Sequence, residues 1–241
     1  MNITYYGHSC FGIEINGKHL LFDPFITPND LARGIDVDAI KADYILVSHG
    51  HEDHIADLER IARNTGASII CNAEISQWLL KKELRNLVPM NIGGKIKLDF
   101  GNVKCVVAQH SSSLPDGSYG GNPMGFVIES EESNFYYAGD TALTYDMKLI
   151  GDYRKIDFAF LPIGDIFTMS VDNAIIACDF IDCDYIIGMH YDTFTAIKID
   201  KEEAIQKFAR SGKRLTLLEI GETIKNKQNN KIGKEWERLL P

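Results

Sequence analysis

Residues 48–54 read Ser48-His49-Gly50-His51-Glu52-Asp53-His54, so three of the seven histidines fall within six residues, beside two acidic side chains. The apolar segment 43–47 before them is typical of a buried strand. The helical spacing of apolar residues after them predicts a helix over about 55–64. The histidines are therefore expected on a loop between a strand and a helix, where a rigid scaffold presents side chains to a cleft.

The spacing within this cluster suggests two neighbouring metal positions. His49 and His51 are two residues apart, so in an extended loop they point the same way and can hold one ion. Asp53 and His54 are adjacent, so their side chains are expected to diverge, which suits a second ion beside the first. Neutral imidazole and carboxylate are ligands that borderline divalent metals accept.

Composition limits the function classes. The chain has 241 residues, 45% hydrophobic and 24% charged, with no segment resembling a linker, so we expect one domain over residues 1–241. A formal net charge of -9 argues against long nucleic acids as partners but leaves room for a small anion near a metal. The amino terminus does not resemble a signal peptide, and no apolar run is long enough to span a membrane. Five scattered cysteines without a Cys-x-x-Cys pair indicate buried, reduced thiols and a cytoplasmic protein.

Apolar periodicity and turn residues predict an alternation of strands and helices after an antiparallel start. Strands are expected at 2–6, 10–15, 18–22, 43–47, 67–71, 90–99, 103–108, 126–128, 135–137, 158–161, 185–189 and 214–219. Helices are expected at 36–41, 55–64, 73–85, 144–150, 171–181 and 201–210, with a long loop at 111–123 and a polar, weakly amphipathic tail from Lys225. The second half repeats the pattern of the first, and two sheets packed face to face with helices outside fit this α/β (α+β) order.

Three further candidate ligands each follow an apolar strand: His110, Asp140 and His190. Strand ends at one edge of a sandwich converge, so these residues are expected in one cleft with the histidine cluster. Asp23 follows another strand and is expected to orient a metal-bound imidazole from behind. The segment Ser111–Ser113 and Asp165 could line the pocket, while His19 is expected to be exposed.

Several motifs carry a family resemblance. They are His49-x-His51-x-Asp53-His54 with His110, Asp140 and His190, and the segments Gly7-His8-Ser9-Cys10-Phe11, Asp23-Pro24, 116–123, 138–141, 161–165 and 189–193. Over about residues 1–222 the chain resembles the metallo-β-lactamase superfamily. Within it, the chain resembles the UPF0173 metal-dependent hydrolases, a group similar to the ascorbate-6-phosphate lactonase branch. The resemblance implies a four-layer αββα sandwich with two metals. His49, His51 and His110 would hold the first ion, Asp53, His54 and His190 the second, and Asp140 would bridge them.

The expected activity is hydrolysis of an ester, lactone or phosphoester in a small anionic substrate. A divalent ion (zinc, manganese, iron or nickel) lowers the pKa of its water towards about 7 and so supplies a nucleophile. Asp53 is the candidate that orients this water. For His8, the roles of proton donor, substrate contact and structural residue stay open.

Four alternative functions are open. The same metals would serve a cyclic-nucleotide phosphodiesterase or a nuclease, two irons would make an oxidoreductase, and a non-enzymatic metal-binding module would use the ligands without catalysis. A serine hydrolase is disfavoured, because Gly7-His8-Ser9-Cys10-Phe11 lacks the second glycine of a nucleophile elbow. A homo-oligomer is also open.

Overall fold

The apolar segments of the chain pair into two sheets with matching internal order. The computed structural model describes residues 1–225 and contains two seven-stranded sheets. The first sheet has the order β14 (Thr223–Lys225), β1 (Asn2–Gly7), β2 (Cys10–Ile15), β3 (Lys18–Phe22), β4 (Tyr44–Leu46), β5 (Ser68–Asn72), β6 (Leu87–Met90). The second has the order β13 (Arg214–Thr216), β12 (Tyr185–Met189), β11 (Phe158–Pro162), β10 (Asn134–Tyr137), β9 (Met124–Glu129), β8 (Gly101–Val107), β7 (Lys95–Leu98).

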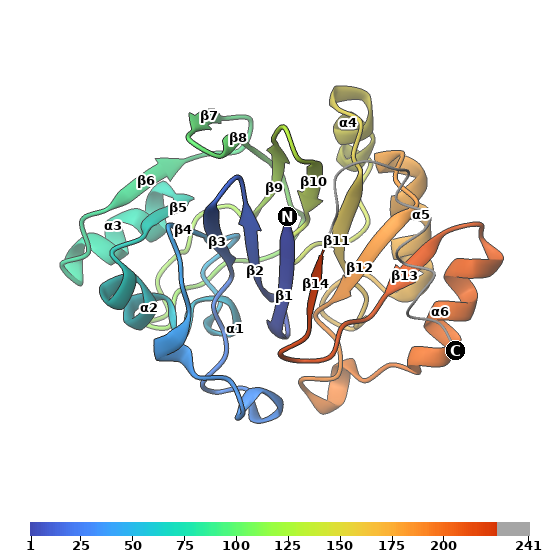
Figure 1. Cartoon of the computed structure of the whole chain (residues 1–241), viewed down its shortest axis with the longest axis horizontal. Helices are drawn as coiled ribbons and strands as arrows, with labels where there is room; N and C mark the ends of the chain where they lie inside the picture. Colours follow the sequence, from blue (N-terminus) through green and yellow to red (C-terminus); the bar gives the residue numbers. More distant parts are fainter. Residues whose placement is uncertain (226–241) are drawn as a thin grey trace.

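Helices cover the outer faces of both sheets, on the two sides of Figure 1. The first sheet carries α2 (Leu58–Thr65) and α3 (Ala73–Lys81), and the second carries α4 (Asp146–Tyr153), α5 (Val171–Ile181) and α6 (Lys201–Arg210). The single turn α1 (Glu52–Ile55) lies nearer the middle of Figure 1. Three short 3-10 turns complete the description: η1 (Asp30–Ala32), η2 (Val37–Ala39) and η3 (Thr195–Ile197). The predicted four-layer αββα sandwich is confirmed.

Each half of the chain begins with antiparallel strands and continues with parallel ones. β1, β2 and β3 pair antiparallel, and then β3 to β6 pair parallel. In the second sheet β7 to β10 pair antiparallel and β10 to β13 pair parallel. As a result β1, β3, β4, β8, β10, β11 and β12 all end at one edge of the sandwich.

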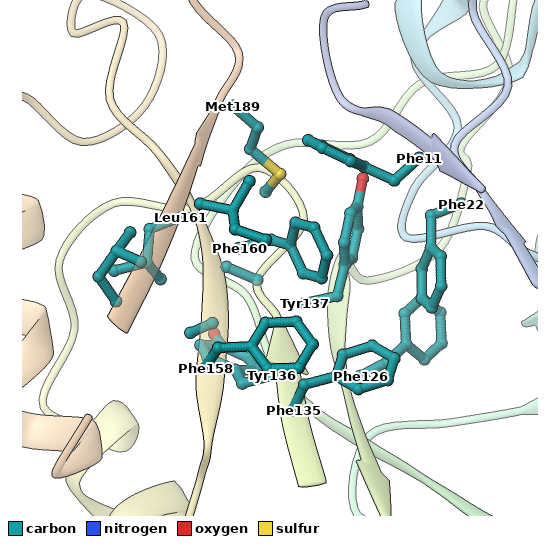
Figure 2. Packing of buried hydrophobic residues seen from close by; sticks show 14 of the residues in the cluster. Phe11, Phe22, Phe126, Phe135, Tyr136, Tyr137, Phe158, Phe160, Leu161 and Met189 are labelled. Carbon is teal, nitrogen blue, oxygen red and sulfur yellow. The ribbon is translucent and has the colours of Figure 1, made fainter. Parts of the chain in front are cut away.

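The interior between the sheets is strongly aromatic. Figure 2 shows Phe11 and Phe22 from the first sheet facing Tyr137 and Phe160 from the second. All four side chains are fully buried, and the Phe11 and Phe160 ring centroids lie 4.6 Å apart. Such rings remove large apolar areas from water and hold the two sheets in a fixed relation. This rigid interior fixes the strand ends that carry the candidate site.

The structure corrects several predicted boundaries. The helix expected over 55–64 begins only at Leu58, as α2, and the separate turn α1 precedes it. Asp57 divides the two: its amide donates to the Pro24 carbonyl, and its carboxylate accepts from the Ile26 and Thr27 amides. The expected strand over 90–99 is likewise split between β6 and β7, which lie in different sheets, by a turn containing Gly93 at φ 88°.

Other ends differ by a few residues. The helix predicted over 73–85 ends at Lys81, because the chain turns left-handed at Glu83, with φ 63°. The last predicted strand, 214–219, shortens to β13, and β14 was not foreseen. The predicted amphipathic end of the tail lies outside the described residues. Within residues 1–225, no helix is both long and apolar enough to cross a bilayer.

Candidate metal centre

Six of the seven histidines meet at the edge where the parallel strands end. The turns after β1, β4, β8 and β12 bring together His8, His49, His51, His54, His110 and His190, and Asp140 follows β10. The seventh histidine, His19, lies within β3 and is half-buried rather than exposed. The structure therefore gathers every candidate ligand named from the sequence.

The first group consists of His49, His51 and His110, whose ligand nitrogens all lie within 4.8 Å of one another. His49 Nε2 is 3.0 Å from His51 Nδ1, and the His49 and His110 ring centroids are 5.2 Å apart. His49 is fully buried, whereas His51 and His110 are partly exposed. One ion at this position would therefore be reachable from solvent.

The second group contains Asp53, His54 and His190 together with His8, again with ligand atoms within 4.8 Å. The expectation that Asp53 and His54 diverge was wrong. Both lie in α1, a single helical turn that begins after His51, and the turn brings their ligand atoms together. His8 enters this group through its Nε2 atom, 3.2 Å from Asp53 Oδ2.

Asp140 lies between the two groups. Its Oδ2 atom is 4.0 Å from His49 Nε2 and 3.6 Å from His110 Nε2 in the first group. It is also 3.3 Å from His54 Nε2 and 2.9 Å from His190 Nε2 in the second. A single carboxylate oxygen therefore faces nitrogens of both groups, which is the geometry of a bridging ligand.

The electrostatics favour a cation in this position. Burial alone would raise the pKa of Asp140, but His190 and His54 outweigh burial and hold that pKa well below its ordinary value. His54 shows the converse: burial opposes its charge, yet Asp140, Asp23 and Asp53 raise its pKa well above the ordinary value. The three carboxylates thus draw a proton onto His54, and a metal ion would replace that proton.

An unpaired polar atom points to the same conclusion. His54 Nε2, which faces Asp140 Oδ2 at 3.3 Å, is buried without a hydrogen-bond partner among the described residues. Buried polar atoms without partners are rare, and each asks for an explanation such as an ion. Burial, followed by the charge of His54, keeps the pKa of His49 well below its ordinary value, and burial lowers that of His110 as well. Neutral imidazole is the form that binds metal, so the residues fit two divalent ions.

The buried carboxylate of Asp23 orients one histidine of each group, His54 directly and His49 through Ser48. Asp23 accepts hydrogen bonds from the Ser48 amide (2.7 Å), the Ser48 hydroxyl (2.6 Å), His54 Nδ1 (2.8 Å) and the Tyr137 hydroxyl (2.8 Å). Because the Ser48 hydroxyl donates to Asp23, Ser48 Oγ accepts from His49 Nδ1, 2.9 Å away. Both imidazoles thereby keep their Nε2 lone pairs directed at the metal positions. This geometry matches the orienting role expected for Asp23.

We expect the variants Ser48→Ala and Asp23→Asn to weaken metal binding in different patterns. Ser48→Ala removes the partner of His49 alone, so affinity should fall about 10–100-fold at the first position only. Asp23→Asn weakens the hold on His49 and His54, so both positions should lose affinity.

The measurement is a titration of metal-free protein with Zn²⁺ against a competing chelator. Tyr137→Phe is the matched control, because it removes a partner of Asp23 that touches no candidate ligand. Equal losses at both positions for Ser48→Ala would contradict the assignment.

The remaining predicted residues divide into two kinds. Ser111 Oγ lies 3.4 Å from His51 Nε2, and Ser112 Oγ accepts from the Gly50 amide at 3.0 Å. These serines hold the histidine loop, as a pocket-lining segment would. Asp165 has no contact of this kind with the ligands; its amide donates to Met169 instead.

Sequence reasoning missed the partners that complete the network. Ser48 and Tyr137 were not identified, although each is adjacent in sequence to a strand end that carries a ligand. Thr193 was also missed: its hydroxyl lies 3.0 Å from His8 Nδ1. For Thr193 the available signal was its position three residues after His190.

Comparison with known proteins identifies the family. A family model described as "Beta-lactamase superfamily domain" matches residues 18–191. The chain is 59% identical to a UPF0173 metal-dependent hydrolase of Flavobacterium johnsoniae and 57% identical to one of Christiangramia forsetii. In both comparisons 93% of this chain and 99% of the relative are covered. Among solved structures, Igni18, a metallo hydrolase of Ignicoccus hospitalis, superposes with a TM-score of 0.84 at 35% identity, covering 92% of this chain and 97% of that one. The chain is therefore a member of the UPF0173 metal-dependent hydrolases within the β-lactamase superfamily.

Proposed function

We propose that this hydrolase uses two divalent metal ions to cleave an ester, lactone or phosphoester bond in a small anionic substrate. The observation that carries the proposal is the position of Asp140 Oδ2 between nitrogens of both groups. His49, His51 and His110 would hold one ion, and Asp53, His54 and His190 the other. When bound, such a pair supplies Lewis acidity and a water activated for attack near neutral pH.

The side chains of the site set its preference for substrate. Asp53 and Asp140 offset only two of the four positive charges that two divalent ions carry, so an anionic substrate would be attracted. Asp53 is partly exposed, with 26% of its side chain accessible, and so can reach a reacting water. Burial would raise its pKa, but His54 and the hydrogen bond from His8 keep that pKa well below the ordinary value. Asp53 therefore stays ionised and can orient the water by accepting its proton in a hydrogen bond.

Elemental analysis and chelation test the two-metal proposal. We expect about two equivalents of metal per chain after reconstitution with zinc, manganese, iron or nickel, and loss of hydrolysis when a chelator removes them. Restoring one metal at a time should show which ion supports the fastest turnover. Clearly fewer than two equivalents at saturation, with activity retained in chelator, would contradict the proposal.

A substrate screen separates the bond types and tests the other functions. The metal-loaded protein is offered lactones, including sugar-phosphate lactones, together with thioesters and cyclic or linear phosphodiesters. Preferred cleavage of cyclic phosphodiesters would favour the phosphodiesterase function over the lactonase-like one. Turnover only with an electron donor would favour a di-iron oxidoreductase, and metal binding without any turnover a binding module.

We propose that the protein works in the cytoplasm on small molecules. All five cysteines are buried and unpaired, which supports a reducing compartment. The net charge of -9 supports a partner other than a long nucleic acid or an anionic membrane. Whether copies associate stays open to measurement by light scattering.

A further inference from the structure

One exposed aromatic side chain touches the candidate site directly. Phe194 is 40% exposed, yet its ring lies edge-on to His8, with 5.4 Å between the centroids. It also lies 6.2 Å from the ring of Phe25, which is buried. His8 in turn contacts Asp53. Only one residue therefore separates the exposed ring from the carboxylate expected to orient the reacting water.

The backbone holds Phe194 in this position. The loop from His190 to Phe194 contains two non-glycine residues in the left-handed region, His190 at φ 56° and Asp192 at φ 62°. Asp192 fixes the loop through three contacts. Its amide donates to the Ile197 carbonyl, its carboxylate accepts from the Ile199 amide at 3.1 Å, and its Oδ2 atom lies 3.5 Å from Lys201 Nζ. Left-handed residues cost about 1–3 kcal/mol each and persist where surrounding contacts hold them, often at functional sites.

A second apolar loop lies beside the first. Ile166, 67% exposed, has φ 55°, which is a genuine outlier for a β-branched side chain. The next residue, Phe167, is also exposed. A cavity of about 370 Å³ is lined both by Ile166 and by Ala196, two residues after Phe194, so the two loops are neighbours. Single exposed apolar residues are ordinary, but Phe194 is the one of these three whose ring contacts the candidate site, at His8.

We infer that Phe194 is a specificity-determining residue that binds an apolar group of the substrate, an aryl or branched alkyl group beside the bond to be cleaved. The inference rests on the proposed function and makes it more specific. An anionic, hydrolysable head bound by the metal ions next to Asp53 would have its neighbouring group near the Phe194 ring, because only His8 separates that ring from Asp53. The substrate class is thus amphipathic: an ester, lactone or phosphoester with an anionic or strongly polarised head and an apolar substituent.

Paired ligands test this without requiring turnover. The metal-loaded protein is titrated calorimetrically with acetate and phenylacetate, and with methylphosphonate and phenylphosphonate. Within each pair the head group is the same and only the phenyl group differs. A ring stacked on Phe194 should favour the phenyl member by about two- to tenfold. Phe194→Ala should abolish that ratio, and Phe194→Leu should retain part of it.

The matched control is Tyr145→Ala. Tyr145 is likewise an exposed aromatic residue, and its ring contacts Phe180, but it lies at the start of α4, outside the site. This variant should keep the preference for phenyl ligands. The inference would be overturned if Phe194→Ala left the ratio of phenyl to methyl affinities unchanged. It would also be overturned if the only effect of Phe194→Ala were a change of oligomeric state, because the ring would then belong to contacts between copies. If the ratio depends on Phe194 but no ester, lactone or phosphoester is cleaved, the proposed reaction fails while the binding role of Phe194 stands.

Discussion

Asp140→Ala is expected to empty both metal positions and to abolish hydrolysis together with them. Asp140 is the residue whose Oδ2 atom lies within 4.0 Å of histidines in both groups, and it is 2% exposed. Loss of a supporting residue alone weakens metal binding by about 10–100-fold, so loss of a shared ligand should exceed that at each position. The measurement is metal content per chain after gel filtration, with hydrolysis of the best substrate from the screen assayed in parallel.

Two further variants separate a metal effect from misfolding. His110→Ala should lose metal mainly at the first position, because His110 belongs to that group alone. His19→Ala removes the one histidine outside the site, on β3, and should keep both metals and full activity. Asp140→Asn preserves volume, so a folded protein is expected even if the alanine variant aggregates. Two full equivalents of metal in a folded Asp140→Asn or Asp140→Ala protein would exclude the bridging role.

The histidine cluster allowed the site to be predicted because its residues are adjacent in sequence. His49, His51 and His54 needed no long-range information to be grouped. His110, Asp140 and His190 could be added because each follows an apolar strand, and parallel strands end at a common edge. The alternation of strands and helices predicted two sheets packed face to face with helices outside, the resemblance implied the four-layer αββα sandwich, and both are confirmed.

What the sequence did not reveal depends on contacts between distant segments. The break between α1 and α2 comes from Asp57, whose carboxylate binds the Ile26 and Thr27 amides. Helical periodicity cannot show such a contact. The hydrogen bond from Tyr137 to Asp23 joins residues from opposite sheets, so only the packed sandwich reveals it. That residues 1–241 form one domain stays a prediction.

His8→Ala is expected to leave both metals in place and to slow hydrolysis by about 10²–10⁴-fold, the usual contribution of a group that assists proton transfer. Burial, with help from the charge of His190, lowers the pKa of His8 to about 4, so its ring is neutral near pH 7. Asp53 can only accept, so His8 Nε2–H donates to it, and His8 Nδ1 accepts from the Thr193 hydroxyl. Neutral His8 therefore holds Asp53 through its Nε2–H, and it could pass a proton to a reacting group only after taking up a second proton at Nδ1, where the Thr193 hydroxyl lies.

His8→Gln distinguishes the roles left open for this histidine. A glutamine amide can donate a hydrogen bond to Asp53 from about the position of the imidazole Nε2–H, but unlike imidazole it has no ring nitrogen that can take up a second proton. Recovery of activity in His8→Gln would assign His8 to orienting Asp53, and activity as low as in His8→Ala would assign it to proton transfer. Loss of metal from His8→Ala would contradict both roles. Because His8 Nε2 lies within 4.8 Å of the ligand atoms of Asp53, His54 and His190, that result would make His8 a further ligand of the second ion.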